Sequence, residues 1–218
     1  MINYSKISNK SLLGKLLRFP LKIIPQNATL PILQGPNKGF RWVKGSGVNG
    51  YWLGCYEFSK LKLIVSFIKE GMVCYDIGAH VGYYSLVFSK LSGGNGRVFS
   101  FEPNPFNLFY LLKHPYINNI KNVNVFPIAL YESEGFSPFI LNGPMSHLEK
   151  MKKKNFVTPT FKLDELVLRN ILPPPDIIKF DVEGAELGVL KGMENILRNK
   201  SVILFSALDD KGKRQEIF

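Results

Sequence analysis

Short apolar runs recur along the chain from residue 72, and between them apolar residues take helical spacing. Runs that are apolar on both faces are typical of strands in a parallel sheet, whereas spacings of three and four residues are typical of helices packed on it. The predicted strands cover residues 72–78, 97–104, 122–130, 176–184 and 202–208, and the predicted helices cover residues 82–91, 105–113 and 185–197, with another near Asp164. This alternation predicts an α/β fold: a Rossmann-like, doubly wound, mostly parallel sheet with helices on both faces.

Upstream of the alternation the pattern is of two kinds. Residues 57–71 carry apolar residues at helical spacing and close on a glycine, which predicts a helix capped by Gly71. Residues 27–50 are rich in Gly, Pro and Asn with aromatic insertions, which indicates loops and short antiparallel strands. In the irregular middle of the chain, Glu134 and Gly135 indicate a hairpin.

Length and composition suit one globular domain: the chain has 218 residues, of which 45% are hydrophobic. We expect that domain over residues 51–218, after an N-terminal extension over residues 1–50. Cys55 and Cys74 lie in unrelated contexts, which indicates neither a zinc site nor a disulfide. No apolar run is long enough for a membrane span, and the N-terminus lacks the apolar core of a secretory signal. We therefore expect a cytoplasmic protein.

The formal net charge of +11 is unevenly distributed. Residues 1–75 carry 11 Lys and Arg against 2 Asp and Glu, whereas residues 76–218 carry 17 against 15. Within the extension, residues 11–24 interleave leucines with basic residues, which predicts a short amphipathic helix ended by Pro20. Two interpretations of that helix stay open: packing on the domain, or peripheral contact with an acidic membrane surface or partner.

Acidic residues stand where most of the predicted strands end. Asp76 ends the first strand, Glu102 the second, Ala129 the third, and Asp181 with Glu183 the fourth. In an open α/β sheet, ligands bind outside the carboxyl ends of the strands, near the point where the strand order reverses. Negative charge gathered at that edge repels phosphates and favours a cation.

A turn with two glycines follows the first strand and has the pattern D-x-G-x-x-x-G. Gly78 and Gly82 let the backbone turn tightly and let a ligand approach the next helix. The close-set glycines that cradle a pyrophosphate are missing, and no Lys or Arg directly follows, which argues against a phosphate-rich ligand. S-adenosylmethionine fits, because it is a sulfonium cation with an ammonium group and a ribose. Glu102 lies 26 residues after Asp76, near the offset at which an acid reaches ribose hydroxyls.

The chain resembles the FkbM-type S-adenosylmethionine-dependent methyltransferases in five segments that keep the family's order and spacing. They are residues 75–86, 96–105, 122–130, 161–166 and 176–192. The resemblance covers roughly residues 52–205. It implies a class I methyltransferase fold, S-adenosylmethionine as the cofactor, and methylation of a hydroxyl on a sugar, glycan or natural-product acceptor.

Site residues follow from the same resemblance. The predicted cofactor-binding residues are Asp76, Gly78, Ala79, His80, Gly82, Glu102 and Ala129, and the "DVEGAE" signature contains Asp181, Glu183, Gly184 and Glu186. His80 stands where the family often has Asn, a swap that still offers a hydrogen bond. Glu102 matches the acid that holds the ribose.

Methyl transfer to a hydroxyl needs an acceptor held in line with the methyl group, and a base, because a sugar hydroxyl is a poor nucleophile at neutral pH. Asp181 and Glu183 are the predicted catalytic residues, one of them as base or as the group that orients the acceptor. The alternative is that they only cap the following helix and hold the loop. Nothing in their spacing requires Mg²⁺, so no metal is expected.

The chain departs from the family pattern near its end. It stops at Phe218 after a polar tail, so we expect the sheet to lack its last two strands, and Ser206 stands where the family often has an acid. A C-terminally truncated remnant that serves as a binding module is therefore the main alternative to an enzyme. A nucleic-acid methyltransferase is less favoured and no nucleic-acid partner is expected, because residues 181–184 read DVEG rather than the N-P-P-Y type of motif used on bases.

Overall fold

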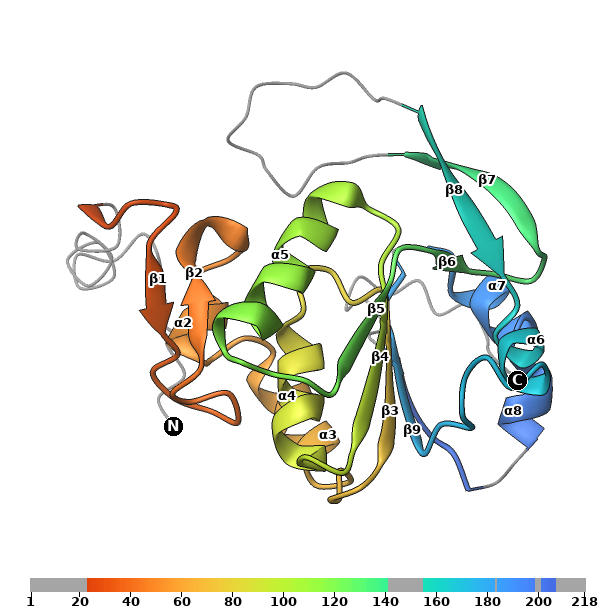
Figure 1. Cartoon of the computed structure of the whole chain (residues 1–218), viewed down its shortest axis with the longest axis horizontal. Helices are drawn as coiled ribbons and strands as arrows, with labels where there is room; N and C mark the ends of the chain where they lie inside the picture. Colours follow the sequence, from red (N-terminus) through yellow and green to blue (C-terminus); the bar gives the residue numbers. More distant parts are fainter. Residues whose placement is uncertain (1–22, 141–154, 183, 199–200, 207–218) are drawn as a thin grey trace.

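A five-stranded parallel sheet forms the centre of the molecule (Figure 1). The computed structural model describes residues 23–140, 155–182, 184–198 and 201–206, to which every structural statement below refers. In spatial order the strands are β10 (Ile203–Ser206), β9 (Ile177–Phe180), β3 (Val73–Ile77), β4 (Arg97–Phe101) and β5 (Val123–Phe126). All neighbours pair in parallel. The order runs outward from β3 in both directions, so the predicted fold class is confirmed and β3 adjoins the point where the order reverses.

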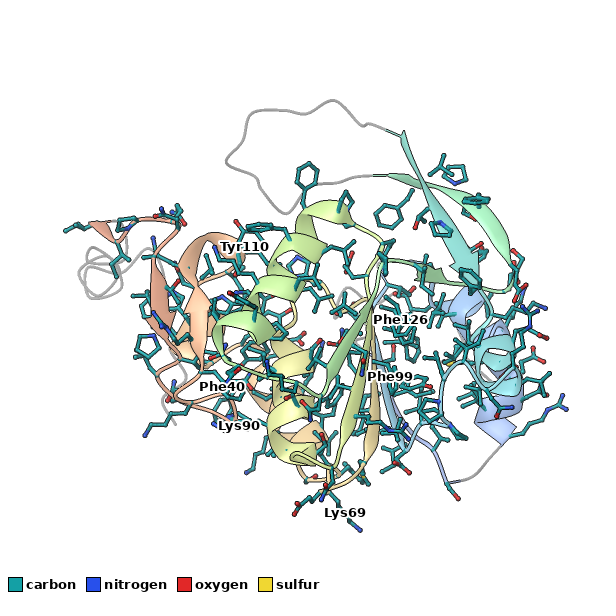
Figure 2. All side chains as sticks on the ribbon, in the orientation of Figure 1. Phe40, Lys69, Lys90, Phe99, Tyr110 and Phe126 are labelled. Carbon is teal, nitrogen blue, oxygen red and sulfur yellow. The ribbon has the colours of Figure 1, made fainter. Side chains whose placement is uncertain are left out.

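Helices cover both faces of this sheet (Figure 1). On one face lie α3 (Phe58–Val65), α4 (Tyr83–Ser92) and α5 (Pro105–Ile117), and on the other lie α6 (Leu163–Leu168), α7 (Glu186–Lys191) and α8 (Glu194–Arg198). Successive residues of β3 point to opposite faces, so Cys74 packs with the α4 side whereas Tyr75 and Ile77 pack with the other. Phe99 and Phe126, labelled in Figure 2, extend the second core with ring centroids 6.1 Å apart.

The segment before the sheet packs on α4 and α5. It contains the antiparallel pair β1 (Thr29–Pro31) and β2 (Arg41–Val43), which the sequence pattern predicts. It also contains a 3-10 turn η2 (Lys44–Ser46) and a short helix α2 (Gly50–Leu53), which were not predicted. The ring of Trp42 is fully buried against His114 of α5, with centroids 3.7 Å apart. On the outer side, Lys90 of α4 lies over the ring of Phe40, 4.8 Å from its centroid (Figure 2). We call residues 29–56 the lead-in segment.

A second, three-stranded sheet corrects two predictions. Residues 122–130 do not form one strand, because Pro127 has no N–H for the ladder and the chain leaves the main sheet there. The chain continues as β6 (Ala129–Leu130), which pairs in parallel with β8 (Asn155–Phe161). β7 (Gly135–Ile140) pairs with the other side of β8, so β6 and β7 are not the two arms of a hairpin at Glu134 and Gly135.

Two helix boundaries also differ from the prediction. α3 ends at Val65, and Gly71 instead lies in the turn before β3, with φ +83° and its N–H donating to the Ser92 carbonyl at 2.8 Å. Residues 185–197 form two helices, α7 and α8, rather than one. The carboxylate of Asp164 accepts hydrogen bonds from the amides of Asn195 and Ile196, which starts α8 as a separate helix.

Several predictions concern residues outside the described ranges. The amphipathic helix of the extension lies almost entirely in residues 1–22, and the predicted lack of two final strands concerns the chain after Ser206, which the structure does not describe. Both predictions therefore stay open. In the described part of the chain, no helix combines the length and the apolar character needed to cross a membrane.

His114 joins three elements by side-chain hydrogen bonds. Its Nε2 accepts the Val43 amide of β2 at 3.2 Å, so its Nδ1 carries the proton and donates to the Val81 carbonyl at 2.8 Å. Only the neutral imidazole can make both bonds. Burial, chiefly, lowers the pKa of His114 to about 4.

The His114 contacts predict acid sensitivity. A histidine whose pKa is lower in the folded than in the unfolded chain contributes stability that is fully present above about pH 6.5 and is lost as pH falls towards 4. That loss is up to about 3 kcal/mol for the whole shift. We expect His114→Gln to be less stable than the wild type at pH 7, with the gap narrowing towards pH 4 in urea unfolding curves. A gap that stays constant between pH 7 and 4 would contradict this account.

Candidate cofactor site

The turn between β3 and α4 forms the base of the candidate site. Gly78, His80 and Gly82 have φ values of +69°, +52° and +89°, so three of five consecutive residues take the left-handed conformation. A Cβ on Gly78 would lie 2.0 Å from the Asp181 carbonyl oxygen, which leaves room only for glycine. The turn is thus pressed against the end of β9.

Four of the five amides from Gly78 to Gly82 already have acceptors inside the protein. The N–H groups of Gly78 and Ala79 both donate to the Phe101 carbonyl, at 2.9 and 3.0 Å, and Gly82 donates to the Ala79 carbonyl at 2.9 Å. His80 donates its N–H to the Glu102 carboxylate at 2.7 Å. A turn whose amides are occupied cannot wrap a pyrophosphate as a glycine-rich phosphate loop does. This supports the prediction that the ligand is not phosphate-rich.

Glu102 lies beside the turn at the end of β4, and its side chain is nearly buried. One carboxylate oxygen accepts the His80 amide, and the other accepts the Asn104 amide at 2.8 Å. Burial raises the pKa of Glu102, against the two amide hydrogen bonds, which lower it. The Asn107 side chain also donates to this carboxylate. Three of the four lone pairs on its two oxygens are therefore used, which leaves one for a further donor.

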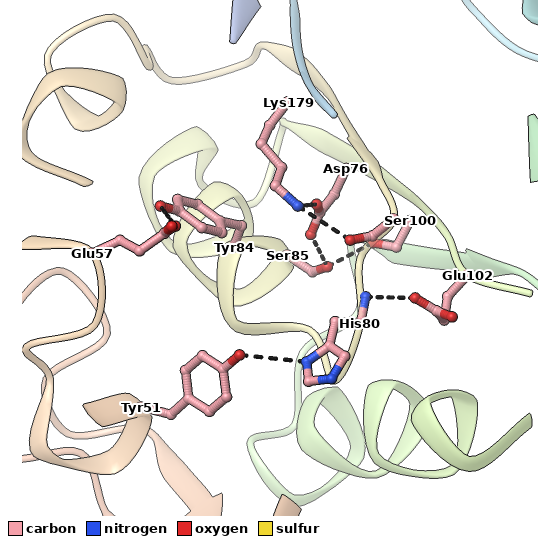
Figure 3. A network of polar contacts seen from close by, with 10 residues as sticks. Tyr51, Glu57, Asp76, His80, Tyr84, Ser85, Ser100, Glu102 and Lys179 are labelled. Atoms are coloured by element: carbon pink, nitrogen blue, oxygen red, sulfur yellow. Dashed lines mark hydrogen bonds and ion pairs between the residues drawn. The ribbon is translucent and has the colours of Figure 1, made fainter. Parts of the chain in front are cut away.

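Asp76 is held behind the turn rather than at its surface (Figure 3). Its carboxylate is fully buried, and one oxygen accepts the Ser85 hydroxyl at 2.6 Å. The other oxygen lies 3.2 Å from Nζ of Lys179 in β9. Lys179 was not among the predicted site residues. A lysine in the middle of an apolar strand can be seen in the sequence, but its register pairing with Asp76 cannot. The negative charge predicted for this edge of the sheet is therefore partly neutralised.

Aromatic side chains from the lead-in segment stand against the turn. The Tyr51 hydroxyl lies 3.4 Å from Nδ1 of His80 (Figure 3), and the Tyr51 ring is 4.5 Å from that of Tyr56 between centroids. Burial and, to a smaller extent, the Lys179 charge lower the pKa of His80 to about 4, so the imidazole is neutral at pH 7. Sequence patterns gave no hint of these tyrosines, because neither stands at a strand end or in a turn of the predicted sheet.

The structure describes one of the two predicted catalytic acids, Asp181. Asp181 is half-buried directly after β9, where its N–H donates to the Ile77 carbonyl at 3.0 Å. Burial raises the pKa of Tyr51 well above its usual value, and the charge of Asp181 contributes a small part. Glu183 lies outside the described residues, while Glu186 turns back to accept the Gly184 amide at 3.1 Å. No group of three metal-ligating side chains gathers in the ranges that the structure describes.

Ala129, a predicted cofactor-binding residue, does not lie at the end of the third strand of the main sheet. It belongs to β6 of the small sheet, opposite Thr160 of β8, because the main-sheet strand ends at Phe126. The amide of Glu102 donates to the Phe126 carbonyl at 3.1 Å, so Phe126 is the residue of that strand beside Glu102.

Residues 76–215 match the family model described as the methyltransferase FkbM domain. The chain belongs to the FkbM methyltransferase family. This confirms the resemblance read from the sequence, and FkbM methyltransferases use S-adenosylmethionine, the predicted cofactor.

The chain is also similar to a curated protein. The hexuronic acid methyltransferase AglP of Haloferax volcanii is 31% identical over 156 residues, which make up 68% of this chain and 61% of AglP. The chain therefore spans about three fifths of that relative. Among solved structures, an FkbM methyltransferase from Methylobacillus flagellatus is similar with a TM-score of 0.45 and 21% identity, over 61% of this chain and 32% of that one. A precorrin-6y C5,15-methyltransferase from Geobacter metallireducens gives 0.41 and 19%, over 66% and 59%.

The residues present fit S-adenosylmethionine. The Glu102 carboxylate keeps a lone pair for a further donor, which suits a ribose hydroxyl, and the occupied turn amides match a ligand without phosphate. Glu102 and the backbone of residues 78–82 would hold the cofactor. Asp76 would act from behind the turn, because its carboxylate has no exposed surface.

The Glu102 geometry predicts a loss of cofactor affinity on truncation. We expect Glu102→Ala to bind S-adenosylhomocysteine at least about tenfold more weakly than the wild type, a difference of about 1.4 kcal/mol in calorimetric titration. Glu134→Ala is the matched control, since that carboxylate lies on the surface in an ion pair with Arg169. Equal affinities of the wild type and Glu102→Ala would remove Glu102 from the site.

Gly78 and Gly71 form a matched pair for testing the turn. Both have positive φ, but a Cβ on Gly71 would meet nothing within 4 Å, whereas one on Gly78 would collide with the Asp181 backbone. We expect Gly71→Ala to cost about 1–2 kcal/mol for the left-handed conformation alone. Gly78→Ala should cost at least about 2 kcal/mol more by urea unfolding, because the strand end must move. Equal costs would mean that the turn is not pressed against β9.

Proposed function

We propose that this protein methylates an oxygen of a sugar, using S-adenosylmethionine as the methyl donor, and that a hexuronic acid is the acceptor class to test first. The observation that carries the proposal is the 31% identity to AglP, which is named a hexuronic acid methyltransferase. The intact turn with Glu102 against it supports an enzyme rather than a remnant that has lost its site.

A hexuronic acid offers two kinds of acceptor oxygen. A ring hydroxyl must lose its proton as it reacts, whereas a carboxylate is already ionised at neutral pH. When bound, S-adenosylmethionine supplies an activated methyl group. For a hydroxyl acceptor, Asp181 would take the proton that the oxygen loses as it is methylated, and the products would be a methyl ether and S-adenosylhomocysteine.

The position of Asp181 favours the hydroxyl. Its amide is tied to Ile77 at the end of β3, beside the turn, and its side chain is half-buried. A carboxylate in such a position can hold an acceptor hydroxyl and receive its proton. Glu183 stays a second candidate for this role from the sequence.

Methyl transfer from labelled S-adenosylmethionine to a hexuronic acid glycoside tests the proposal, with the matching hexose glycoside alongside. We expect label in the uronic acid product that resists mild alkali, because an ether survives treatment that cleaves a methyl ester. Label released by alkali would identify the carboxylate as the acceptor, and no transfer to either sugar would overturn the proposal.

The same assay predicts the role of Asp181. We expect Asp181→Asn to lose at least about 100-fold in kcat, the usual size of a general-base contribution, while its affinity for S-adenosylhomocysteine stays within about threefold. Glu165→Gln, which changes a surface carboxylate paired with Arg169, is the control. A kcat within about threefold of the wild type would show that Asp181 is not the base.

A further inference from the structure

Lys179 is a charged side chain in a strand that is otherwise apolar. β9 reads Ile-Ile-Lys-Phe and is buried along its whole length, and Lys179 is only 6% exposed. Removing an ammonium group from water is costly, and a buried ion pair replaced by apolar residues of similar size often leaves a protein as stable or more so. Stability alone therefore does not explain a lysine at this position.

The contacts of Lys179 lead to the cofactor turn. Its Nζ donates to the Gly78 carbonyl at 3.1 Å and lies 3.2 Å from the Asp76 carboxylate (Figure 3). The ammonium group also lies 5.3 Å from the ring centroid of Tyr84, whose hydroxyl donates to Glu57 at 2.8 Å. The ammonium is thus held between a carboxylate and an aromatic face while it binds a backbone carbonyl of the turn.

Asp76 is fixed in its own place independently of Lys179. Ser85 of α4 donates to Asp76, and Ser100 of β4 donates to Ser85 at 2.9 Å. The chain of hydroxyls joins the three elements that surround the turn. Asp76 is therefore a fixed negative charge that keeps the Lys179 ammonium under the Gly78 carbonyl.

The Gly78 carbonyl that Lys179 binds belongs to the peptide group between Gly78 and Ala79, and the orientation of this group fixes the path of the turn. With the Gly78 carbonyl bound on one side, the Ala79 amide meets the Phe101 carbonyl on the other. The next amide, that of His80, then reaches Glu102. If this peptide rotated, the His80 amide would leave Glu102, and the Glu102 carboxylate would lose one of its two backbone donors.

We propose that Lys179 is a positioning residue for the cofactor site: its ammonium holds the Gly78 carbonyl, and Asp76 serves as its buried counter-ion instead of touching the cofactor. This proposal depends on one part of the proposed function, the binding of S-adenosylmethionine at this site, and not on the identity of the acceptor.

Paired neutral variants separate the carbonyl contact from the charge. Asp76→Asn removes the buried carboxylate, and in that background Lys179→Gln keeps a neutral N–H donor for the Gly78 carbonyl whereas Lys179→Met does not. Neither double variant leaves an unpaired buried charge. We expect both to fold, with Tm values within a few degrees of each other.

Two measurements on these full-length variants test the proposal. In calorimetric titration we expect Asp76→Asn/Lys179→Met to bind S-adenosylhomocysteine at least about tenfold more weakly than Asp76→Asn/Lys179→Gln. In the ligand-free proteins we expect the His80 amide to exchange with deuterium faster in the Met variant. Lys179→Arg alone, which keeps both the charge and the donors, should bind within about threefold of the wild type.

Equal affinity and equal His80 exchange in the two double variants would overturn the proposal. Failure of either double variant to fold would overturn it too, because the ion pair would then be a requirement of the fold. A folded wild type that does not bind S-adenosylhomocysteine would refute the proposed function instead, and the exchange comparison would still decide whether Lys179 holds the turn.

Discussion

Every residue of β3 is buried, because the strand lies in the middle of the sheet with a helical layer on each face. Polar groups at its carboxyl end therefore have to find partners inside the protein, since leaving them unpaired costs several kcal/mol. The turn amides meet Phe101 and Glu102, and Asp76 meets Ser85 and Lys179. The hydrogen bonds that satisfy these buried polar groups give the site its shape.

The same constraint selects the kind of ligand. Since the fold uses most of the turn amides, what remains for a ligand is an acceptor, the unused lone pair of Glu102, and a neutral imidazole at His80. Acceptors recognise hydroxyl groups and cations, and they repel phosphate. A nucleoside with a sulfonium group suits such a surface better than a dinucleotide does.

The sequence predicted what is local. The Asp76, Gly78 and Gly82 spacing and the acid at position 102 follow from strand ends and turn residues, which can be read within about 30 positions. It failed where a partner is distant or a strand breaks. Ala129 was wrongly assigned to the end of the third main-sheet strand, because the apolar pattern continues through Pro127 although the pairing does not. Lys179 was missed because its partner lies 103 residues earlier in the chain.

The lead-in segment has a consequence for how separable the methyltransferase core is. Trp42 and Val43 complete the surroundings of His114, His114 donates to the carbonyl of Val81 within the turn, and the Tyr51 hydroxyl lies beside His80. The cofactor turn is thus supported by a part of the chain that precedes the whole sheet. A domain transplanted without that part would carry all the residues of the family motifs and still lack the walls that give the turn its shape.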